Sequence, residues 1–245
     1  MVRHIALGVS LFFAMNSSAL SQTSKTSSKS SGTTLKAFAY FAHIHDQQLD
    51  DFLHSIRPRA LTHELRERVL KMLPKGDLVN PSAEYEARIE SLERILKYHQ
   101  RDSIIEIKVI RANTATAVFL AGAAILITEP ALKILNVEEL QAVVAHELGH
   151  EYYWNQFERA RQNRDNSQMQ ELELRCDGIA VVTLHGVGID PKNLISAITK
   201  LNRYNEHPGS AGSANYVSFN DRLEFIRQMI ELVSSKPASP ARNRE

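Results

Sequence analysis

The sequence predicts an α+β domain that is mostly helical, with a small antiparallel sheet beside one of its helices. Apolar residues recur at helical spacing over residues 37–99 and again over residues 136–233. Between these regions, residues 105–109 alternate apolar and polar side chains, which is typical of a half-buried strand. Residues 114–120 and 124–128 are two further strand candidates. Because the helical stretches are much longer than the strands, helices are expected to dominate the fold.

The composition of the 245-residue chain is that of an ordinary globular protein. Its hydrophobic content of 43% and its charged content of 23% are both typical. The length allows one or two domains, of which we expect one. The formal net charge of +1 gives no indication of nucleic-acid binding, so no nucleic-acid partner is expected. Cys176 is the only cysteine, which excludes an intramolecular disulfide.

Residues 1–21 are predicted to be a signal peptide. Arg3 gives a short positive start, an apolar run follows, and Ala19 and Ser21 place small residues at the −3 and −1 positions of a cut before Gln22. The apolar run is short for a membrane span, and an uncleaved anchor is the alternative. We therefore expect export, to the periplasm or to the extracellular space.

Composition divides the rest of the chain into three segments. Residues 22–36 are Ser/Thr-rich and predict a flexible linker, and residues 237–245 predict a disordered tail. The folded region between them, residues 37–236, consists of a helical N-terminal part, 37–103, and a second part, 104–236, that contains the strands. The apolar stretch around the strands is too interrupted by threonine for a transmembrane helix, so no membrane-spanning segment is expected after the signal.

Capping residues mark the starts of the predicted helices. Asn136, with Glu139 three residues later, resembles a capping box at the start of a helix that continues to residue 150 and beyond. The charged segment 158–166 then predicts a loop or a solvated helix end. Further helix starts are predicted at Asn80-Pro81, near Ser167, at Asp190-Pro191 and at Ser218.

The helix that begins at Asn136 carries the motif His-Glu-x-x-His, formed by His146, Glu147 and His150. Residues i and i+4 lie about one turn apart on the same helix face, so both imidazoles can bind one ion. Glu147 lies beside them and can reach a water on that ion. Two histidines with a neighbouring carboxylate base are typical of a zinc hydrolase. So short a pattern also occurs by chance, and a third ligand is needed to decide.

A catalytic zinc ion usually takes three protein ligands and one water. Glu173 lies on a later segment that can fold back against the first helix. Asp177, four residues on, lies on the same helix face and can accept a hydrogen bond from a ligand histidine. The predicted site therefore has His146, His150 and Glu173 as ligands of one zinc ion per chain, with Glu147 as the base.

These two motifs, in this order, resemble those of the M48 metallopeptidases, which are gluzincins with a His-Glu-x-x-His helix and a later Glu-x-x-x-Asp motif. Here Cys176 stands in the second motif where the family usually has alanine. The resemblance covers roughly residues 104–230 and includes an Asn-led strand, a small-residue turn, an Ile-rich strand and a late arginine: Asn113, Ala121-Gly122-Ala123, Ile125 to Thr128 and Arg222. It implies a zincin-like metallopeptidase domain whose catalytic part is residues 104–236.

One departure from the family concerns the residue that stabilises the oxyanion. The family often has His-Pro six residues before the late arginine, where this chain has Tyr216, and the only His-Pro pair here is His207-Pro208. Tyr216 or His207, with Arg222, is a candidate for this role, and a loop residue without a role is the alternative. Cys176 is interpreted as a small buried residue, the alternative being a thiolate that binds zinc or senses oxidation.

The resemblance implies an exported zinc-dependent endopeptidase that hydrolyses peptide bonds in unfolded or misfolded envelope proteins. Glu147 is expected to take a proton from a zinc-activated water and to pass it to the leaving amine. An exposed strand near Thr116 or Ile125 is expected to bind an extended peptide by adding a strand. The helices of residues 37–100 are expected to wall the cleft, and residues 22–100 as a removable inhibitory segment are an open alternative.

Two other functions compete with this prediction. A chaperone-like or scaffold protein would retain the zinc site and cleave only weakly. A structural zinc protein would usually supply four protein ligands, and only a contribution from Cys176 would complete such a set. The presence of Glu147 favours the enzyme, because a scaffold needs no base beside its metal. The sequence does not indicate an oligomeric state.

Overall fold

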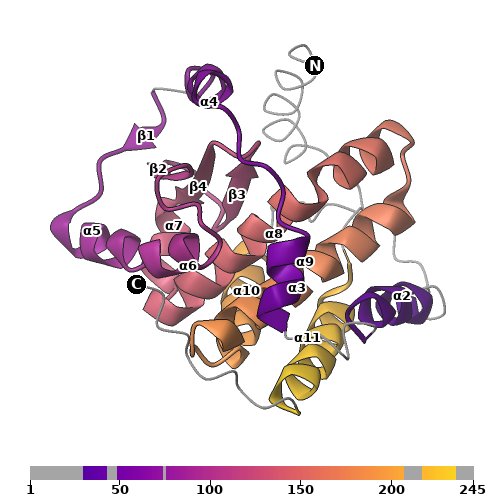
Figure 1. The fold of residues 1–245 in the computed structure, drawn as a ribbon. Helices are drawn as coiled ribbons and strands as arrows, with labels where there is room; N and C mark the ends of the chain where they lie inside the picture. The colour runs from indigo at the N-terminus through magenta and orange to yellow at the C-terminus, as the bar shows by residue number, and fades with distance from the viewer. Residues whose placement is uncertain (1–29, 43–48, 74–75, 207–216, 236–245) are drawn as a thin grey trace.

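The computed structural model describes four parts of the chain: residues 30–42, 49–73, 76–206 and 217–235. They form a mostly helical α+β domain with one four-stranded sheet, which confirms the predicted fold class (Figure 1). The predicted signal, residues 1–21, and the predicted tail, residues 237–245, lie outside the described residues. Within the described parts, no helix combines the length and the apolar character that crossing a bilayer requires.

The described part of residues 30–103, here called the N-terminal shell, consists of short elements. They are α2 (Ser30–Ala42), α3 (Leu49–Ser55), α4 (His63–Leu70), β1 (Leu78–Val79), α5 (Ala83–Glu90) and α6 (Glu93–Tyr98). The prediction of a linker over residues 22–36 is wrong from Ser30 onward, because α2 begins there. Ala37 and Phe41 of α2 are fully buried, so tertiary packing outweighs the Ser/Thr-rich composition at the start of this helix.

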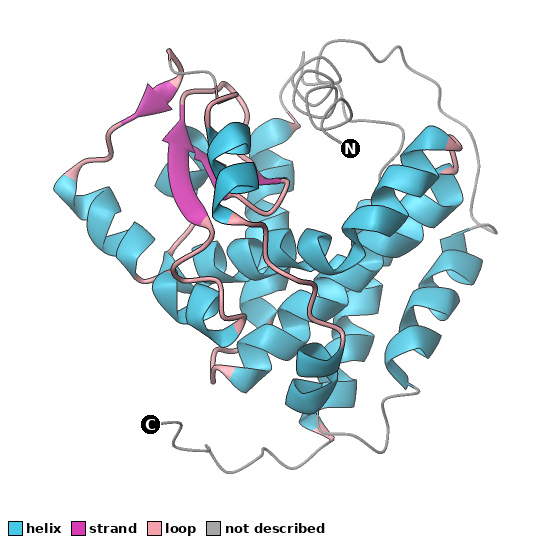
Figure 2. Ribbon diagram, turned by 45° about the horizontal axis from the view of Figure 1, so that its top comes forward, coloured by secondary structure: helices cyan, strands magenta, loops and turns pink. Residues whose placement is uncertain are grey.

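The catalytic part begins with three strands and continues with five helices. They are β2 (Glu106–Ile110), β3 (Ala117–Leu120), β4 (Ala124–Thr128), α7 (Glu129–Ile134), α8 (Val137–Gln162), α9 (Asn166–Gly186), α10 (Lys192–Asn205) and α11 (Phe219–Ser234). In Figure 2 the strands lie toward one side of the molecule and these helices fill most of the rest. Of the two alternatives for residues 158–166, a loop or a solvated helix end, the second holds up to residue 162, because α8 continues to Gln162 and α9 begins at Asn166.

The sheet has the strand order β1-β2-β4-β3 and is mixed, whereas an antiparallel sheet was expected. β3 and β4 form the antiparallel pair, but β2 pairs with β4 in parallel. The tight turn at residues 121–123 forces β3 and β4 into a hairpin. The longer connection at residues 111–116 leads from β2 past the position of β4 to β3. As a result, β4 lies between β2 and β3 in the sheet. One edge of the sheet is therefore β3, the strand next to α8.

β4 is the centre of the fold, because it is buried on both faces. Ile125 and Ile127 face the main helical core, and Leu126 faces a smaller core formed with Val69 and Leu73 at the end of α4. Alternate residues of a strand point to opposite faces, so a strand covered on both sides has no polar alternation. This burial fixes β3, its hairpin partner, and hence the edge of the sheet beside α8.

α8 and α9 form the most extensive helix pair in the described parts. The predicted capping box is present at the start of α8: Asn136 accepts a hydrogen bond from the Glu139 backbone N–H, and the Glu139 side chain accepts one from the Asn136 N–H. Gly149 lies directly against the backbone of Cys176, where a Cβ atom would approach the Cα of Cys176 to 2.8 Å. The absence of a side chain at residue 149 lets the two helices approach closely.

Candidate metal centre

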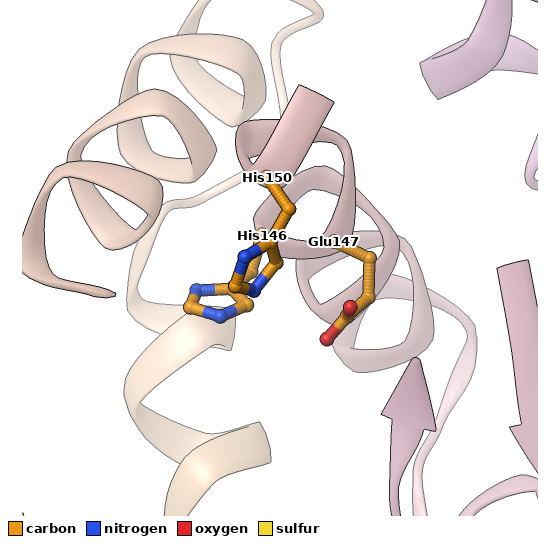
Figure 3. Close-up of side chains that lie close together, drawn as sticks. All are labelled: His146, Glu147 and His150. Carbon is orange, nitrogen blue, oxygen red and sulfur yellow. The ribbon is translucent and has the colours of Figure 1, made fainter. Parts of the chain in front are cut away.

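Two imidazoles project from one face of α8. The rings of His146 and His150 lie 5.2 Å apart between centroids, one helical turn from each other. Glu147 projects beside them, and a ligand atom from each of the three residues lies within 4.8 Å of the others. Figure 3 shows the two rings side by side and the carboxylate of Glu147 slightly apart from them. The predicted i, i+4 geometry is thus present in the structure.

Glu173 on α9 faces both imidazoles. Its Oε2 lies 3.5 Å from Nε2 of His146, and its Oε1 lies 4.0 Å from Nε2 of His150. Burial opposes the ionisation of this carboxyl, but its electrostatic interaction with the two imidazoles and its hydrogen bond with His146 outweigh burial and lower its pKa. The carboxylate therefore stands opposite the two ring nitrogens that α8 presents, because α9 folds back along α8.

Asp177 and Arg222 hold the other side of the His146 ring. Nδ1 of His146 lies 2.8 Å from Oδ1 of Asp177, which is fully buried. Arg222 of α11 donates to both oxygens of Asp177, from Nε at 2.9 Å and from Nη2 at 2.6 Å. A carboxylate that accepts from Nδ1–H leaves Nε2 of the same ring as the site for a metal. Arg222 thus positions Asp177, and Asp177 positions His146.

The carboxylate of Glu147 is held by the edge of the sheet. Its Oε2 accepts a hydrogen bond of 2.8 Å from the backbone N–H of Phe119 on β3. This hydrogen bond distinguishes the two glutamates of the site. Glu147 is bound to β3, whereas Glu173 faces the two imidazoles. The role of Phe119 could not be predicted from the sequence, because the group involved is a backbone N–H, which every residue except proline carries. The prediction of an exposed strand beside the metal helix was the nearest signal.

The pKa values of the buried side chains show how charge is distributed between α8 and α9. Burial lowers the pKa of His150 to about 4, so this ring is neutral near pH 7. Burial also acts to lower the pKa of His146, but the charge and hydrogen bond of Asp177 outweigh it and raise the pKa to about 10. Burial raises the pKa of Glu147 to about 7. Burial disfavours the ionised Asp177 as well, yet Arg222 and His146 bring its pKa down to about 2.

This donor set fits a divalent cation. Glu147, Glu173 and Asp177 provide three buried or nearly buried carboxylates, against the single guanidinium of Arg222. Imidazole nitrogens with one carboxylate are the ligands that zinc prefers in catalytic sites. The predicted ligands and the predicted base are therefore brought together by α8, α9 and β3.

The remaining predicted residues have different outcomes. His207 and Tyr216 both lie outside the described residues, so their role stays a prediction. Cys176 is fully buried at the contact between α8 and α9, and burial raises the pKa of its thiol well above the ordinary value. A protonated thiol in a helix contact favours the interpretation of Cys176 as a small packing residue. Arg222 is engaged by Asp177, which favours a positioning role over contact with an oxyanion.

Two histidines one turn apart, a carboxylate facing both and a second carboxylate beside them are the arrangement of metal-dependent hydrolases. The family model for Peptidase family M48 matches residues 80–245. The chain therefore belongs to peptidase family M48, and its class of activity is that of a metallopeptidase. The match includes α5 and α6, which lie before the region where the motifs suggested the resemblance. A search among curated proteins found no match.

Proposed function

We propose that the protein is a zinc-dependent endopeptidase. The observation that carries this proposal is the position of Glu147, between the paired imidazoles and the Phe119 N–H of the edge strand. A base in this position reaches both the ion and a peptide bond presented along β3. A site that served only to hold metal would need no such carboxylate, and structural zinc usually takes four protein ligands.

His146, His150 and Glu173 are the proposed ligands of one zinc ion. The ion would act as a Lewis acid and would lower the pKa of a bound water to about 7. Glu147 accepts the proton of that water and later donates it to the leaving amine. Tyr216 or His207 is the proposed donor to the oxyanion.

The outer edge of β3 is the proposed substrate site. β3 pairs with β4 on one side only, so its other edge presents backbone groups toward α8. An extended peptide can add to such an edge as a further strand. Binding through the backbone depends little on side chains, which favours unfolded or misfolded proteins as substrates. Export to the periplasm or the extracellular space, where envelope proteins would be the targets, is proposed from residues 1–21 alone.

The alternative function is a chaperone-like or scaffold protein that keeps the zinc site and cleaves weakly. The same edge strand would bind unfolded chains in that case. The two functions differ only in whether a bound peptide is hydrolysed, so they are separated by the role of Glu147.

The deciding experiment compares casein cleavage by the zinc-loaded protein and by its Glu147→Gln variant. Loss of the base is expected to reduce the rate by about 10²–10⁴, with the zinc content unchanged. Glu138→Gln is the matched control, because Glu138 is an exposed glutamate on the same helix. Equal cleavage by the Glu147→Gln variant would refute the peptidase mechanism. No cleavage by the native protein, despite bound zinc, would favour the chaperone-like function.

A further inference from the structure

A separate cavity lies next to the proposed catalytic residues. It has a volume of about 320 Å³. Its walls come from the segment between α3 and α4, the edge strand with its turn, and the second half of α8, and include Pro58, Arg59, Phe119, Gly122, Trp154 and Arg159. At about 30 Å³ per water molecule, the cavity has room for about ten waters, which is enough for a side chain. His146, His150 and Glu173 do not line it.

The cavity adjoins the proposed scissile site through two residues. Phe119 is one of the residues that line the cavity, and its backbone N–H donates to Glu147. Glu151, another lining residue, directly follows His150 on α8. A peptide added along β3 therefore passes the mouth of the cavity within a residue or two of the bond that Glu147 serves. A side chain of that peptide can enter the cavity.

The walls are held in place by buried interactions. Arg101 forms a buried ion pair with Glu151, at 2.8 Å from Nε to Oε1, and donates to the Pro58 carbonyl at 2.6 Å. These bonds tie the segment between α3 and α4 to α8. The rings of Phe119 and Trp154 pack edge to face, with 6.1 Å between centroids. The cavity is thus built into the fold, and a ligand would need little reorganisation to enter it.

The charge of the cavity is positive. Glu151 is neutralised by Arg101, whereas Arg59 and Arg159 are exposed at the wall and form no ion pair within the described residues. Arg161, two residues along α8, is instead paired with Glu158. Guanidinium groups bind carboxylates through paired, charge-assisted hydrogen bonds. The Trp154 ring offers an apolar wall for the stem of a side chain.

We propose that this cavity is a substrate subsite for an acidic side chain, so that cleavage is favoured near aspartate or glutamate. The proposal rests on the proposed peptidase function, to which it adds a preference among unfolded substrates. The recognised group is a carboxylate bound by Arg59 and Arg159. The free carboxyl end of a peptide has the same chemistry and must be separated from it by experiment.

The test uses the fluorescence of Trp154, the only tryptophan in the sequence. The full chain with Glu147→Gln, loaded with zinc, is titrated with a blocked pentapeptide of four alanines and a central glutamate. Two comparison peptides carry glutamine at the centre. One has a blocked carboxyl end, and the other has a free carboxyl end. The glutamate peptide is expected to change the fluorescence and to bind about tenfold more tightly than the blocked glutamine peptide.

The matched variants are Arg59→Gln, Arg159→Gln and Arg161→Gln. Arg59 and Arg159 are exposed and Arg161 is partly exposed, so the fold should tolerate all three changes. The first two are expected to reduce the glutamate preference about fivefold or more, and Arg161→Gln is expected to keep it. Equal binding of the two blocked peptides, or a preference unchanged in Arg59→Gln and Arg159→Gln, would overturn the proposal. Binding of the free-ended glutamine peptide as tight as that of the glutamate peptide would also overturn it, in favour of a terminal carboxylate.

The binding measurement does not depend on cleavage, so its failure can be told apart from failure of the peptidase function. If the native protein cleaves casein but the titration shows no glutamate preference, the subsite is refuted and the peptidase function stands. A glutamate preference that depends on the two arginines, in a protein that cleaves nothing, supports the cavity as a binding site for an acidic side chain but refutes its role in cleavage together with the peptidase function.

Discussion

The metal helix pair, α8 and α9, and the N-terminal shell are stabilised in different ways. The two helices pack through small residues, with Gly149 against Cys176, and bury the charged groups of the site between them. The shell consists of short elements that reach these helices through single large side chains. Phe41 packs against Gly178 of α9, where any side chain would collide with its ring, and Tyr98 packs in the same way against Gly186.

This difference indicates that the shell supports the two helices that carry the metal site. Phe41 lies beside Asp177, the residue that holds His146, because Gly178 follows Asp177 directly. Arg101 pairs with Glu151, which follows His150. Parts of the shell therefore contact α8 and α9 one residue away from site residues. These contacts favour a permanent part of the enzyme over a removable inhibitory segment.

The largest effect is expected from removing the Phe41 side chain, which packs α2 against α9. Phe41→Ala removes a fully buried aromatic ring and is expected to lower the free energy of unfolding by about 3–5 kcal/mol. For a chain of this size the Tm should fall by about 10 °C, measured by thermal unfolding. Leu35→Ala is the control, because Leu35 is on the same helix but 67% exposed. Equal stability of the two variants would show that α2 is not an anchor.

A smaller effect is expected within the metal helix pair. Asp177→Asn weakens the acceptor for His146 Nδ1–H and leaves Arg222 without its carboxylate. The zinc affinity should fall by about 10–100-fold, measured by competition with a chelator. Glu171→Gln makes the same change on α9 at a residue that pairs with Arg175 instead of the site. An unchanged zinc affinity in Asp177→Asn would mean that His146 is oriented by other contacts.

The smallest effect is expected at His99, which joins the shell to both helices. Its ring bonds to the Tyr152 hydroxyl at 2.7 Å and to the Thr183 hydroxyl at 2.9 Å. Burial, together with Arg57 and Arg101, lowers its pKa to about 3. Between pH 6.5 and pH 3 the unfolded chain therefore binds the extra proton, so this residue contributes stability above pH 6.5 that is lost as the pH falls.

The slope due to His99 is at most about 1.4 kcal/mol per pH unit. Urea unfolding at pH 7, 6 and 5 should show this loss in the native protein and a flatter profile in His99→Gln. Parallel profiles in the two proteins would place the pH dependence elsewhere.

The comparison also explains which features could be predicted from the sequence. The capping box of Asn136 and Glu139 and the spacing of His146 and His150 are local patterns, and both are present in the structure. In contrast, β1 is two residues long and exists only because it pairs with β2. The start of α2 depends on α9, far along the chain, and the link from Phe119 to Glu147 uses a backbone group. Contacts between distant segments leave no periodic signal in the sequence.

Arg222 has a consequence for the order in which the enzyme matures. It lies on α11, the last helix described, yet it is the partner that holds the buried Asp177. Chains are synthesised from the N-terminus, and their segments become available for folding in that order. Asp177 is therefore synthesised before its partner Arg222, so the contacts that hold Asp177 and, through it, His146 form only after α11 has been added.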